Sequence, residues 1–538
     1  MFRENTKHEQ ESLLDTSTWM DKSVKEKLGK SWAPIFYENV FSKIDESPFA
    51  VLYSENGAPN APVNTLMSLE IMKQMYNMTD IELMERYHFD YLINVAIGQR
   101  TLGEDTISER TLYNFRERLY KHTMEHPETE TLMFGQFKNL LGVFTEKTGQ
   151  KMDAQRIDTT MFMSNIKKSG RISLAYDVLV KSVRAIPEES RSDRLQAVLM
   201  PSFKTNILYK SKTSEAGDRL SQLLRLGAEA LDILNAMPED NARDERRILT
   251  RLLDEQGKPD INGDINAKGK KEISSGSLQS AHDEDATYRI KAGESQSGYV
   301  LEITETCSKG NDVQLITDYN VAPNTTADVD IVKDRMPAIS AAGCKDLYGD
   351  GGFYGEDVIE RAAEEGITIH YTDMTGIEPK KLSASDFKMN ETGNKIEGCP
   401  GGLEPTRTGE CKTQVTAHFD KSACEACPLR EQCPGKANKN DVTVRIPKKS
   451  IEAAKQRDAI KRDCAVNTSY RAGIEGTNHA LKQKGLGKLK VRGLAKCKVV
   501  CGLKVIAQNV SRFINYMQGK YKHKFDISPT KGELCPIQ

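Results

Sequence analysis

Three acidic residues that lie far apart in the sequence have the side chains and settings needed to bind divalent cations. Asp158 lies in the strand-like segment QRIDTTMFM, Asp350 precedes the glycine-rich segment GGFYG, and Glu475 lies in the basic segment YRAGIEGTNHALKQK. Carboxylate oxygens are the ligands that Mg²⁺ and Mn²⁺ prefer. Two such ions about 4 Å apart can activate an attacking oxygen and stabilise a leaving oxygen in a phosphoryl displacement. Together the three acids indicate a phosphoryl-transfer site that uses two metal ions.

A helix over residues 470–484 would place several charged side chains on one polar face. Arg471, Glu475 and Lys482 fall at positions i−4, i and i+7 of such a helix. Taken alone, Arg471 and Glu475 are most simply explained as a surface ion pair. Beside the other two acids, the same pattern places Lys482 where it can face a DNA phosphate.

A second kind of metal site is indicated by cysteine spacing. Cys424, Cys427 and Cys433 are separated by two and five residues, which is typical of thiolates that bind structural zinc. We favour Cys399 as the fourth ligand, because the glycines that follow it allow a tight turn. Cys411 and, after it, His418 are the alternatives, and free thiols without a metal are the less favoured interpretation. A closed site with four ligands would be structural rather than catalytic.

The basic residues are concentrated near the C-terminus. Residues 445–524 hold 20 Lys and Arg against 4 Asp and Glu, a charge of +16, although the whole chain has a formal net charge of −1. Clustered Lys and Arg neutralise phosphates and release counterions, so this stretch favours a polyanion partner. A solvated basic face is the alternative interpretation.

Length and composition exclude several classes of protein. A chain of 538 residues is too long for one hydrophobic core, so several domains or large insertions are expected. With 38% hydrophobic residues the chain is not mainly disordered. No apolar run approaches the roughly 20 residues needed to cross a membrane. The charged N-terminus lacks the apolar segment of a signal peptide, which predicts a cytoplasmic protein whose cysteines are reduced or bind metal.

Strand and helix patterns around the acids predict a mixed α/β core. Segments 298–304 and 313–321 alternate apolar and polar residues and are separated by the turn signal SKGND, which predicts a hairpin. Segments 344–350 and 367–373 are expected to be strands joined by a helix. Ligand sites of such a βαβ-like unit lie past the carboxyl ends of the strands, where Asp350 is found.

Helical patterns flank this core. In the segment after Ser108, apolar residues recur on one stripe and Arg110, Arg116 and Arg118 lie mostly off it, which predicts a small helical domain with a basic DNA-binding face. Residues 175–280 are also predicted to be mainly helical. The apolar stripe of the last helix, between residues 499 and 517, is expected to be buried core.

The acidic segments resemble a known family. QRIDTTMF, LYGDGGFYG and YRAGIEGTNHALKQK look like the three acidic motifs of bacterial DDE insertion-sequence transposases, and the spacing of Arg471, Glu475 and Lys482 matches the end of the family's Tyr-Arg-Glu-Lys signature. SERTLYNFRERL resembles the family's InsH-like N-terminal domain. DEDATYRIKAGESQSGYVLEI resembles the region of the second strand. The similarity extends from about residue 31 to residue 512.

This resemblance implies an RNase H-like catalytic core, a mixed sheet flanked by helices. A helical insertion and a cysteine-rich, zinc-binding insertion would interrupt it. The expected divisions are a helical N-terminal DNA-binding domain (1–148), the first part of the core (149–174), the helical insertion (175–280), the second part of the core (281–375), the cysteine-rich insertion (376–445), the C-terminal core helices (446–520) and a tail (521–538).

The resemblance also implies a reaction and partners. Hydrolysis at the transposon ends would free a 3′ hydroxyl, which would then attack target DNA. Asp158, Asp350 and Glu475 would bind two Mg²⁺ or Mn²⁺ ions, and Arg471 and Lys482 would position phosphates. Double-stranded DNA, as transposon ends and as target, would be the partner. Because two ends must be brought together, a homodimer on DNA is expected.

Two other functions are compatible with the same residues. A metal-dependent nuclease would hydrolyse DNA without joining strands. A transposase-derived DNA-binding protein without catalytic activity would use the zinc loop and the basic helix for recognition only. The presence of all three acids makes the second alternative weaker, because a binding module has no use for isolated carboxylates near phosphates.

Overall fold

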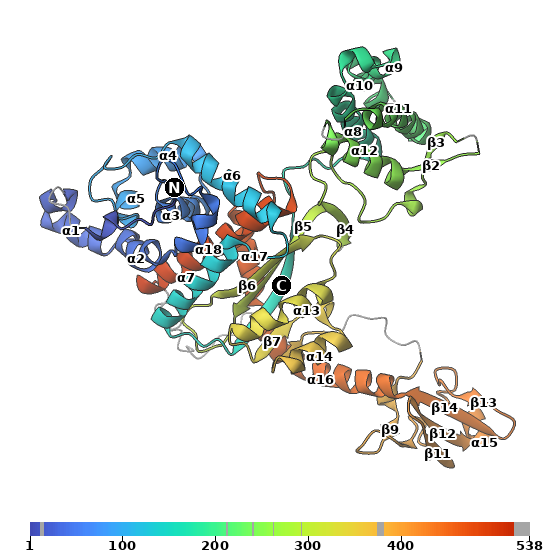
Figure 1. The fold of residues 1–538 in the computed structure, drawn as a ribbon. Coiled ribbons are helices and arrows are strands. Elements are labelled where there is room, and N and C mark those ends of the chain that lie inside the picture. Colours follow the sequence, from blue (N-terminus) through green and yellow to red (C-terminus); the bar gives the residue numbers. More distant parts are fainter. Residues whose placement is uncertain are drawn as a thin grey trace, which may run out of the picture.

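A computed structural model describes residues 1–520 of the chain, apart from residues 11–14, 211–212, 239–240, 262, 292 and 374–380. A central sheet with its helices lies between an N-terminal group of helices and two peripheral lobes, one helical and one rich in strands (Figure 1). Within the described part of the chain, no helix has the length and apolar character that a membrane crossing requires.

The central sheet has the mixed topology expected from the sequence. Its strands are β1 (Ala154–Phe162), β4 (Thr287–Lys291), β5 (Glu294–Thr306), β6 (Ile316–Pro323), β7 (Asp346–Gly349) and β8 (Thr368–Tyr371). The main order is β6-β5-β1-β7-β8, and β4 pairs with β5. Strands β1, β7 and β8 are parallel, whereas β5 is antiparallel to its neighbours β1, β4 and β6. This α/β arrangement is compatible with an RNase H-like core, and the predicted hairpin and βαβ unit are confirmed.

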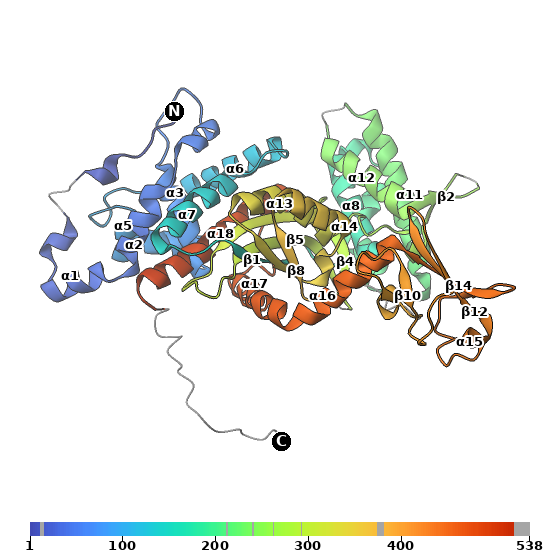
Figure 2. The same ribbon diagram turned by 90° about the horizontal axis from the view of Figure 1, so that it is seen from below.

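Alternating side chains of the sheet are buried on both faces. On one face, Ile157 and Leu347 pack against α13 (Asp328–Ala341) and α14 (Glu356–Glu364). On the other, Leu301 and Ile303 belong to a core that includes α17 (Gly473–Gln483) and α18 (Leu494–Met517). Figure 2 shows α13 and α17 on opposite sides of the sheet.

Helix α18 joins the N-terminal helices to this sheet. Its predicted apolar stripe is buried from Val499 to Phe513, whereas Met517 at the helix end is 44% exposed. Phe513 stacks on Phe144 of α7 with ring centroids 4.5 Å apart. The sheet, α18 and the N-terminal helices therefore share one continuous core. Those N-terminal helices are α1 (Lys22–Gly29), α2 (Trp32–Asn39), α3 (Val63–Tyr76), α4 (Asp80–Phe89), α5 (Tyr91–Ala96), α6 (Glu109–Glu125) and α7 (Leu132–Thr148).

The segment between β1 and β4 forms a helical lobe with its own core. Leucines at intervals of three and four in α11 and α12 supply most of this core, as the apolar periodicity predicts. The lobe contains α8 (Arg171–Ala185), α9 (Asp193–Val198), α10 (Pro201–Leu208), α11 (Ala216–Ala236), α12 (Arg243–Gln256) and the short strands β2 (Gly257–Pro259) and β3 (Ile265–Ala267).

The cysteine-rich segment is more regular than the loop-rich region that the sequence suggested. Alternating residues such as Val415, Ala417 and Phe419 are buried on one face of a small antiparallel sheet of order β11-β12-β14-β13. In the sequence, these apolar residues alternate with a period of two over only a few positions, and the many turn-forming residues around them obscured the pattern. The elements are β9 (Lys388–Met389), β10 (Ile396–Gly398), β11 (Arg407–Glu410), β12 (Gln414–Asp420), α15 (Lys421–Glu425), β13 (Lys436–Ala437) and β14 (Asp441–Pro447).

The single helix predicted over 470–484 is wrong in one respect. The chain forms α16 (Lys448–Arg471), turns at Ala472, and continues as α17. The guanidinium of Arg156 donates to the carbonyl oxygen of Tyr470 at 3.0 Å and lies against Gly473, where a Cβ would overlap it. A buried cation from β1 therefore takes one of the last carbonyls of α16 and requires glycine at the start of α17.

Candidate active site

The three predicted acids meet around one arginine. Arg471, at the end of α16, lies 3.4 Å from Asp158, 3.3 Å from Asp350 and 3.4 Å from Glu475, measured from guanidinium nitrogen to carboxylate oxygen. Asp158 is in the middle of β1, Asp350 directly follows β7, and Glu475 is in the first turn of α17. The parallel pairing of β1 with β7 brings the first two acids together, and the turn at Ala472 brings the third.

Asp158 is the most buried of the three acids. One carboxylate oxygen accepts a hydrogen bond from the side-chain amide of Asn478 at 2.9 Å, and the other accepts from the backbone N–H of Thr159 at 2.9 Å. Burial raises the pKa of Asp158, and the neighbouring Arg471 opposes this rise. The Asn478 contact attaches α17 directly to β1.

Asp350 and Glu475 are more accessible. Asp350 caps the short turn after β7, because its carboxylate accepts the backbone N–H of Gly352 at 2.8 Å. The adjacent Gly351 N–H donates to Asp373 at 2.7 Å. The Glu475 side chain is 69% exposed. One acid is therefore held deep in the sheet while two face outward, as a site for a large substrate requires.

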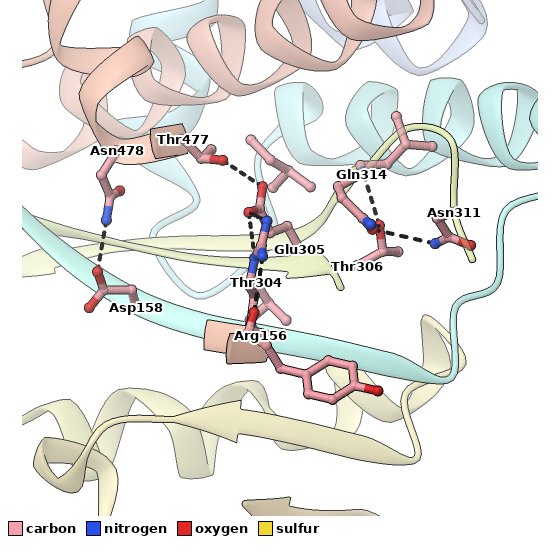
Figure 3. A network of polar contacts seen from close by, with 12 residues as sticks. Arg156, Asp158, Thr304, Glu305, Thr306, Asn311, Gln314, Thr477 and Asn478 are labelled. Carbon is pink, nitrogen blue, oxygen red and sulfur yellow. Dashed lines mark hydrogen bonds and ion pairs between the residues drawn. The ribbon is translucent and has the colours of Figure 1, made fainter. Parts of the chain in front are cut away.

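A buried ionic network holds the strand and the helices of the site in register (Figure 3). Glu305 of β5 is fully buried, and it pairs with Arg156 at 2.6 Å and with Arg512 of α18 at 2.8 Å. It also accepts a hydrogen bond from Thr477 of α17 at 2.8 Å. Despite its burial, the two guanidinium groups lower the pKa of Glu305, so it is ionised. Glu305 thus connects β1, β5, α17 and α18 beneath the acids.

The donor set suits a hard divalent cation. The acids supply only oxygen, and the buried Asn478 has a side-chain oxygen with no partner among the described residues. As placed, no three His, Cys, Asp or Glu side chains in the described part of the chain are grouped as metal ligands. In this arrangement the positive charge among the three carboxylates is the guanidinium of Arg471.

The predicted DNA-contacting residues differ in accessibility. Lys482, Arg110 and Arg118 are exposed, and Arg118 lies over the ring of Tyr53. Arg116 is different, because its side chain is only 13% exposed and is paired with Glu70 at 2.6 Å and with Asp80. The structure therefore gives Arg116 an internal role between α6, α3 and α4 and offers no support for a phosphate contact.

Four cysteines gather in the strand-rich lobe. Cys399, Cys424, Cys427 and Cys433 line a cavity of about 20 Å³, which has room for about one water molecule. A Cβ on Gly401 would lie 2.8 Å from the sulfur of Cys427 and 3.6 Å from that of Cys399.

The two alternative ligands, Cys411 and His418, are not among the residues lining this cavity. The thiol of Cys411 is exposed beside Thr413, and His418 pairs with Asp441 at 2.8 Å. The structure therefore brings Cys399 together with the three closely spaced cysteines.

Sequence reasoning missed the residues that support the acids. Asn478, Arg156, Glu305 and Thr477 were not among the predicted site residues. One signal was available, because Arg156 lies two residues before Asp158 and so shares its face of the strand. Nothing in the local pattern around Glu305 indicated that two arginines more than a hundred residues away would neutralise it.

Comparison with known protein families agrees with the fold. A family described as "Transposase domain (DUF772)" matches residues 25–118, and one described as "Transposase DDE domain" matches residues 399–514. The searches of curated proteins and of solved structures returned no match. The mixed α/β core is compatible with an RNase H-like fold, and three carboxylates converge beside its central strand. Together with this core, the two matches support a DDE insertion-sequence transposase.

The two matched segments cover different parts of the candidate site. Residues 25–118 contain Arg110, Arg116 and Arg118, and residues 399–514 contain the four cysteines, Arg471, Glu475 and Lys482. Asp158 and Asp350 lie outside both segments. Their place in the site therefore depends on the geometry described above.

Proposed function

We propose that this protein binds the ends of an insertion sequence and catalyses metal-dependent cleavage and transfer of DNA strands. The observation that carries the proposal is the convergence of Asp158, Asp350 and Glu475 on Arg471 from three separate elements. Carboxylates on β1, directly after β7 and in the first turn of α17 form an acidic centre in a chain whose basic residues are concentrated near the C-terminus. Such a centre is suited to phosphoryl transfer on a polyanion.

Each residue of the centre has a distinct role in this proposal. Asp158, Asp350 and Glu475 would hold two Mg²⁺ or Mn²⁺ ions, which when bound supply activation of the attacking oxygen and stabilisation of the leaving oxygen. Asn478 orients the carboxylate of Asp158 through its amide. Arg471 and Lys482 bind DNA phosphates and so orient the scissile phosphodiester.

The four cysteines of the strand-rich lobe would bind a structural zinc ion. Support comes from the donor set of Cys399, Cys424, Cys427 and Cys433, from the small cavity that they line, and from Gly401, whose missing side chain leaves room beside two of the sulfurs. The N–H of Gly435 also donates to the sulfur of Cys433 at 3.4 Å. Zinc would stabilise the lobe and take no part in catalysis.

Double-stranded DNA is the proposed partner, and a homodimer on DNA is the proposed assembly, because a transposition reaction joins two ends. Hydrolysis without strand joining is the nearest alternative, since the same carboxylates serve both reactions. A binding protein without catalytic activity is less favoured, because it would have no need for three acids assembled on separate elements.

The test is incubation of the full chain with linear DNA that carries the sequences flanking its gene, with Mg²⁺ or with chelator. Gel analysis of cut and joined strands should show metal-dependent products of both kinds. Asp158→Asn, Asp350→Asn and Glu475→Gln should each abolish both products, and Glu146→Gln, an exposed residue of α7, should leave them unchanged. Products from the three acid variants would refute the proposal, and cut strands without joined strands would favour the nuclease.

A further inference from the structure

Two basic segments from distant parts of the sequence lie side by side next to the acidic centre. The first, residues 163–170, continues from the end of β1, and the second, residues 484–493, follows α17. Backbone hydrogen bonds join them: Met163 N–H to Gly487 O at 3.1 Å, Leu489 N–H to Met163 O at 2.8 Å, and Asn165 N–H to Val491 O at 2.8 Å. Figure 1 shows the red loop after α17 beside the chain that leads from β1 to the helical lobe.

We propose that this surface, which we call the basic ledge, binds the backbone of duplex DNA next to the reacting phosphate. The ledge consists of the exposed side chains of Lys167, Lys168, Lys488, Lys490 and Arg492. Its location relative to the reaction rests on the function proposed above. Its binding of DNA rests only on its charge and shape.

The charge of the ledge is not balanced within its own segments. Residues 163–170 and 484–493 contain no Asp or Glu. The carboxylates of the nearby Asp283 and Asp285 accept hydrogen bonds from within the protein. Asp283 accepts from Ser164 and Tyr299, both at 2.5 Å, and Asp285 accepts the Leu494 N–H at 3.0 Å. The carboxylate of Glu82, which is near Lys490, accepts the backbone N–H of Thr79 at 2.7 Å. Clustered cations of this kind attract a polyanion.

The backbone of the ledge is fixed rather than free. Besides the three backbone bonds, the guanidinium of Arg492 donates to the carbonyl oxygen of Asn165 at 2.8 Å. Lys504, buried in α18, donates to Lys484 O and to Gln74 of α3. Both segments are thus anchored, which lowers the entropy lost when their side chains engage phosphates.

The distance from the acids suits a continuous duplex. Met163 is five residues beyond Asp158 along an extended strand, a separation of about 17 Å. At about 3.4 Å per base pair, the ledge would contact the backbone about five base pairs from the reacting phosphate. Because the strand and the following segment carry both groups, one rigid element sets this spacing.

The test compares DNA binding by two double variants with equal loss of charge. Lys488→Ala with Lys490→Ala removes part of the ledge, and Lys147→Ala with Lys151→Ala removes two exposed cations near the opposite end of β1. Binding of a labelled 30-base-pair mixed-sequence duplex is measured by fluorescence anisotropy, with chelator, over a range of salt concentrations. A matched single-stranded RNA serves as a second probe.

The Lys488→Ala, Lys490→Ala variant should bind the duplex about tenfold more weakly. The magnitude of the slope of log K, where K is the association constant, against the logarithm of the salt concentration should fall by about 1.8. The control variant should match the wild type. Equal affinity and slope in wild type and ledge variant would overturn the ledge and leave the proposed function intact. Failure of the wild type to bind duplex would overturn both, and tighter binding of RNA than of duplex would overturn the choice of partner.

If the first variant has an altered thermal unfolding temperature, Lys167→Ala with Lys168→Ala tests the same surface from the other segment. These two side chains are exposed, and their removal leaves the backbone ladder between the segments in place. The same loss of affinity and slope is expected. Wild-type binding by a folded variant of this second pair would overturn the ledge.

Discussion

The acidic centre and the cysteine cluster are two candidate metal sites that are assembled in opposite ways. The contact between Asp158 and Asn478 joins residues 320 positions apart in the sequence. The four cysteines lie between residues 399 and 433 and are brought together by one small sheet with its own core. The first site therefore depends on the packing of the whole core, whereas the second depends on one lobe.

The comparison also shows two ways of holding ligands in place. In the acidic centre, the buried Glu305 and its two arginines position the elements that carry the acids. In the cysteine cluster, short turns and the apolar residues of β12 and β14 hold the cysteines in place. A change in one region should leave the ligands of the other intact.

The largest expected effect is on the cysteine cluster. Cys427→Ser should reduce bound zinc from one ion per chain to almost none, because the binding free energy of a structural zinc site is on the order of 10 kcal/mol. Metal analysis after gel filtration measures this, and limited proteolysis should show faster cleavage within 381–445. Cys411→Ser, outside the cavity, is the control and should retain zinc. Loss of zinc from both variants would indicate that Cys411 is a ligand, and retention of zinc in Cys427→Ser would contradict the proposed site.

The next effect separates the two regions directly. Glu305→Gln leaves the guanidinium groups of Arg156 and Arg512 without their buried counter-charge, so the free energy of unfolding should fall by about 3–5 kcal/mol. DNA cleavage should fall by at least about a hundredfold because the strand and helices of the site lose their register. Zinc content should not change. Denaturant titration, the cleavage assay and metal analysis give the three readouts.

The matched control for this variant lies on the same strand. Glu302 is also a fully buried glutamate of β5, but it has no arginine within ion-pair distance among the described residues. Glu302→Gln should therefore retain most of the activity. Equal losses from both variants would mean that Glu305 supports the fold in general rather than the acidic centre.

A smaller effect is expected from Asn478. Asn478→Ala removes the amide that orients Asp158, and cleavage should fall by about 10–100-fold, as for other residues that orient metal ligands. Binding of duplex DNA should not change. Gln483→Ala, an exposed residue at the end of the same helix, is the control. Unchanged cleavage rates in Asn478→Ala would remove this residue from the proposed mechanism.

The last effect concerns pH and is the smallest when taken per pH unit. Burial and the nearby Asp318 raise the pKa of Glu302 to about 8, from an ordinary value of 4.5. Between these values the folded chain binds a proton that the unfolded chain has released, so stability falls as pH rises, by at most about 1.4 kcal/mol per pH unit. Denaturant titrations at pH 5, 6, 7 and 8 should show a shallower fall in Glu302→Gln. Parallel curves would contradict the raised pKa.

Local patterns predicted much of the core. The hairpin was visible because apolar and polar residues alternate with a period of two, and the strand containing Asp158 was visible because its neighbours are apolar or β-branched. The buried stripe of α18 was visible for the corresponding reason in a helix. The break between α16 and α17 was not predictable from such patterns, because the guanidinium that ends α16 comes from Arg156, 314 residues earlier.

The sequence by itself determined which groups can do chemistry: one carboxylate within a strand, one at a strand end and one in a basic helix, closely spaced cysteines, and a C-terminal concentration of Lys and Arg. Tertiary structure alone decided which of these groups meet. In the folded chain, Arg116 forms internal ion pairs and Arg471 lies among the three acids. The reason is physical, because side-chain type and spacing fix local geometry, while distant contacts depend on how buried charges find their partners when the elements pack.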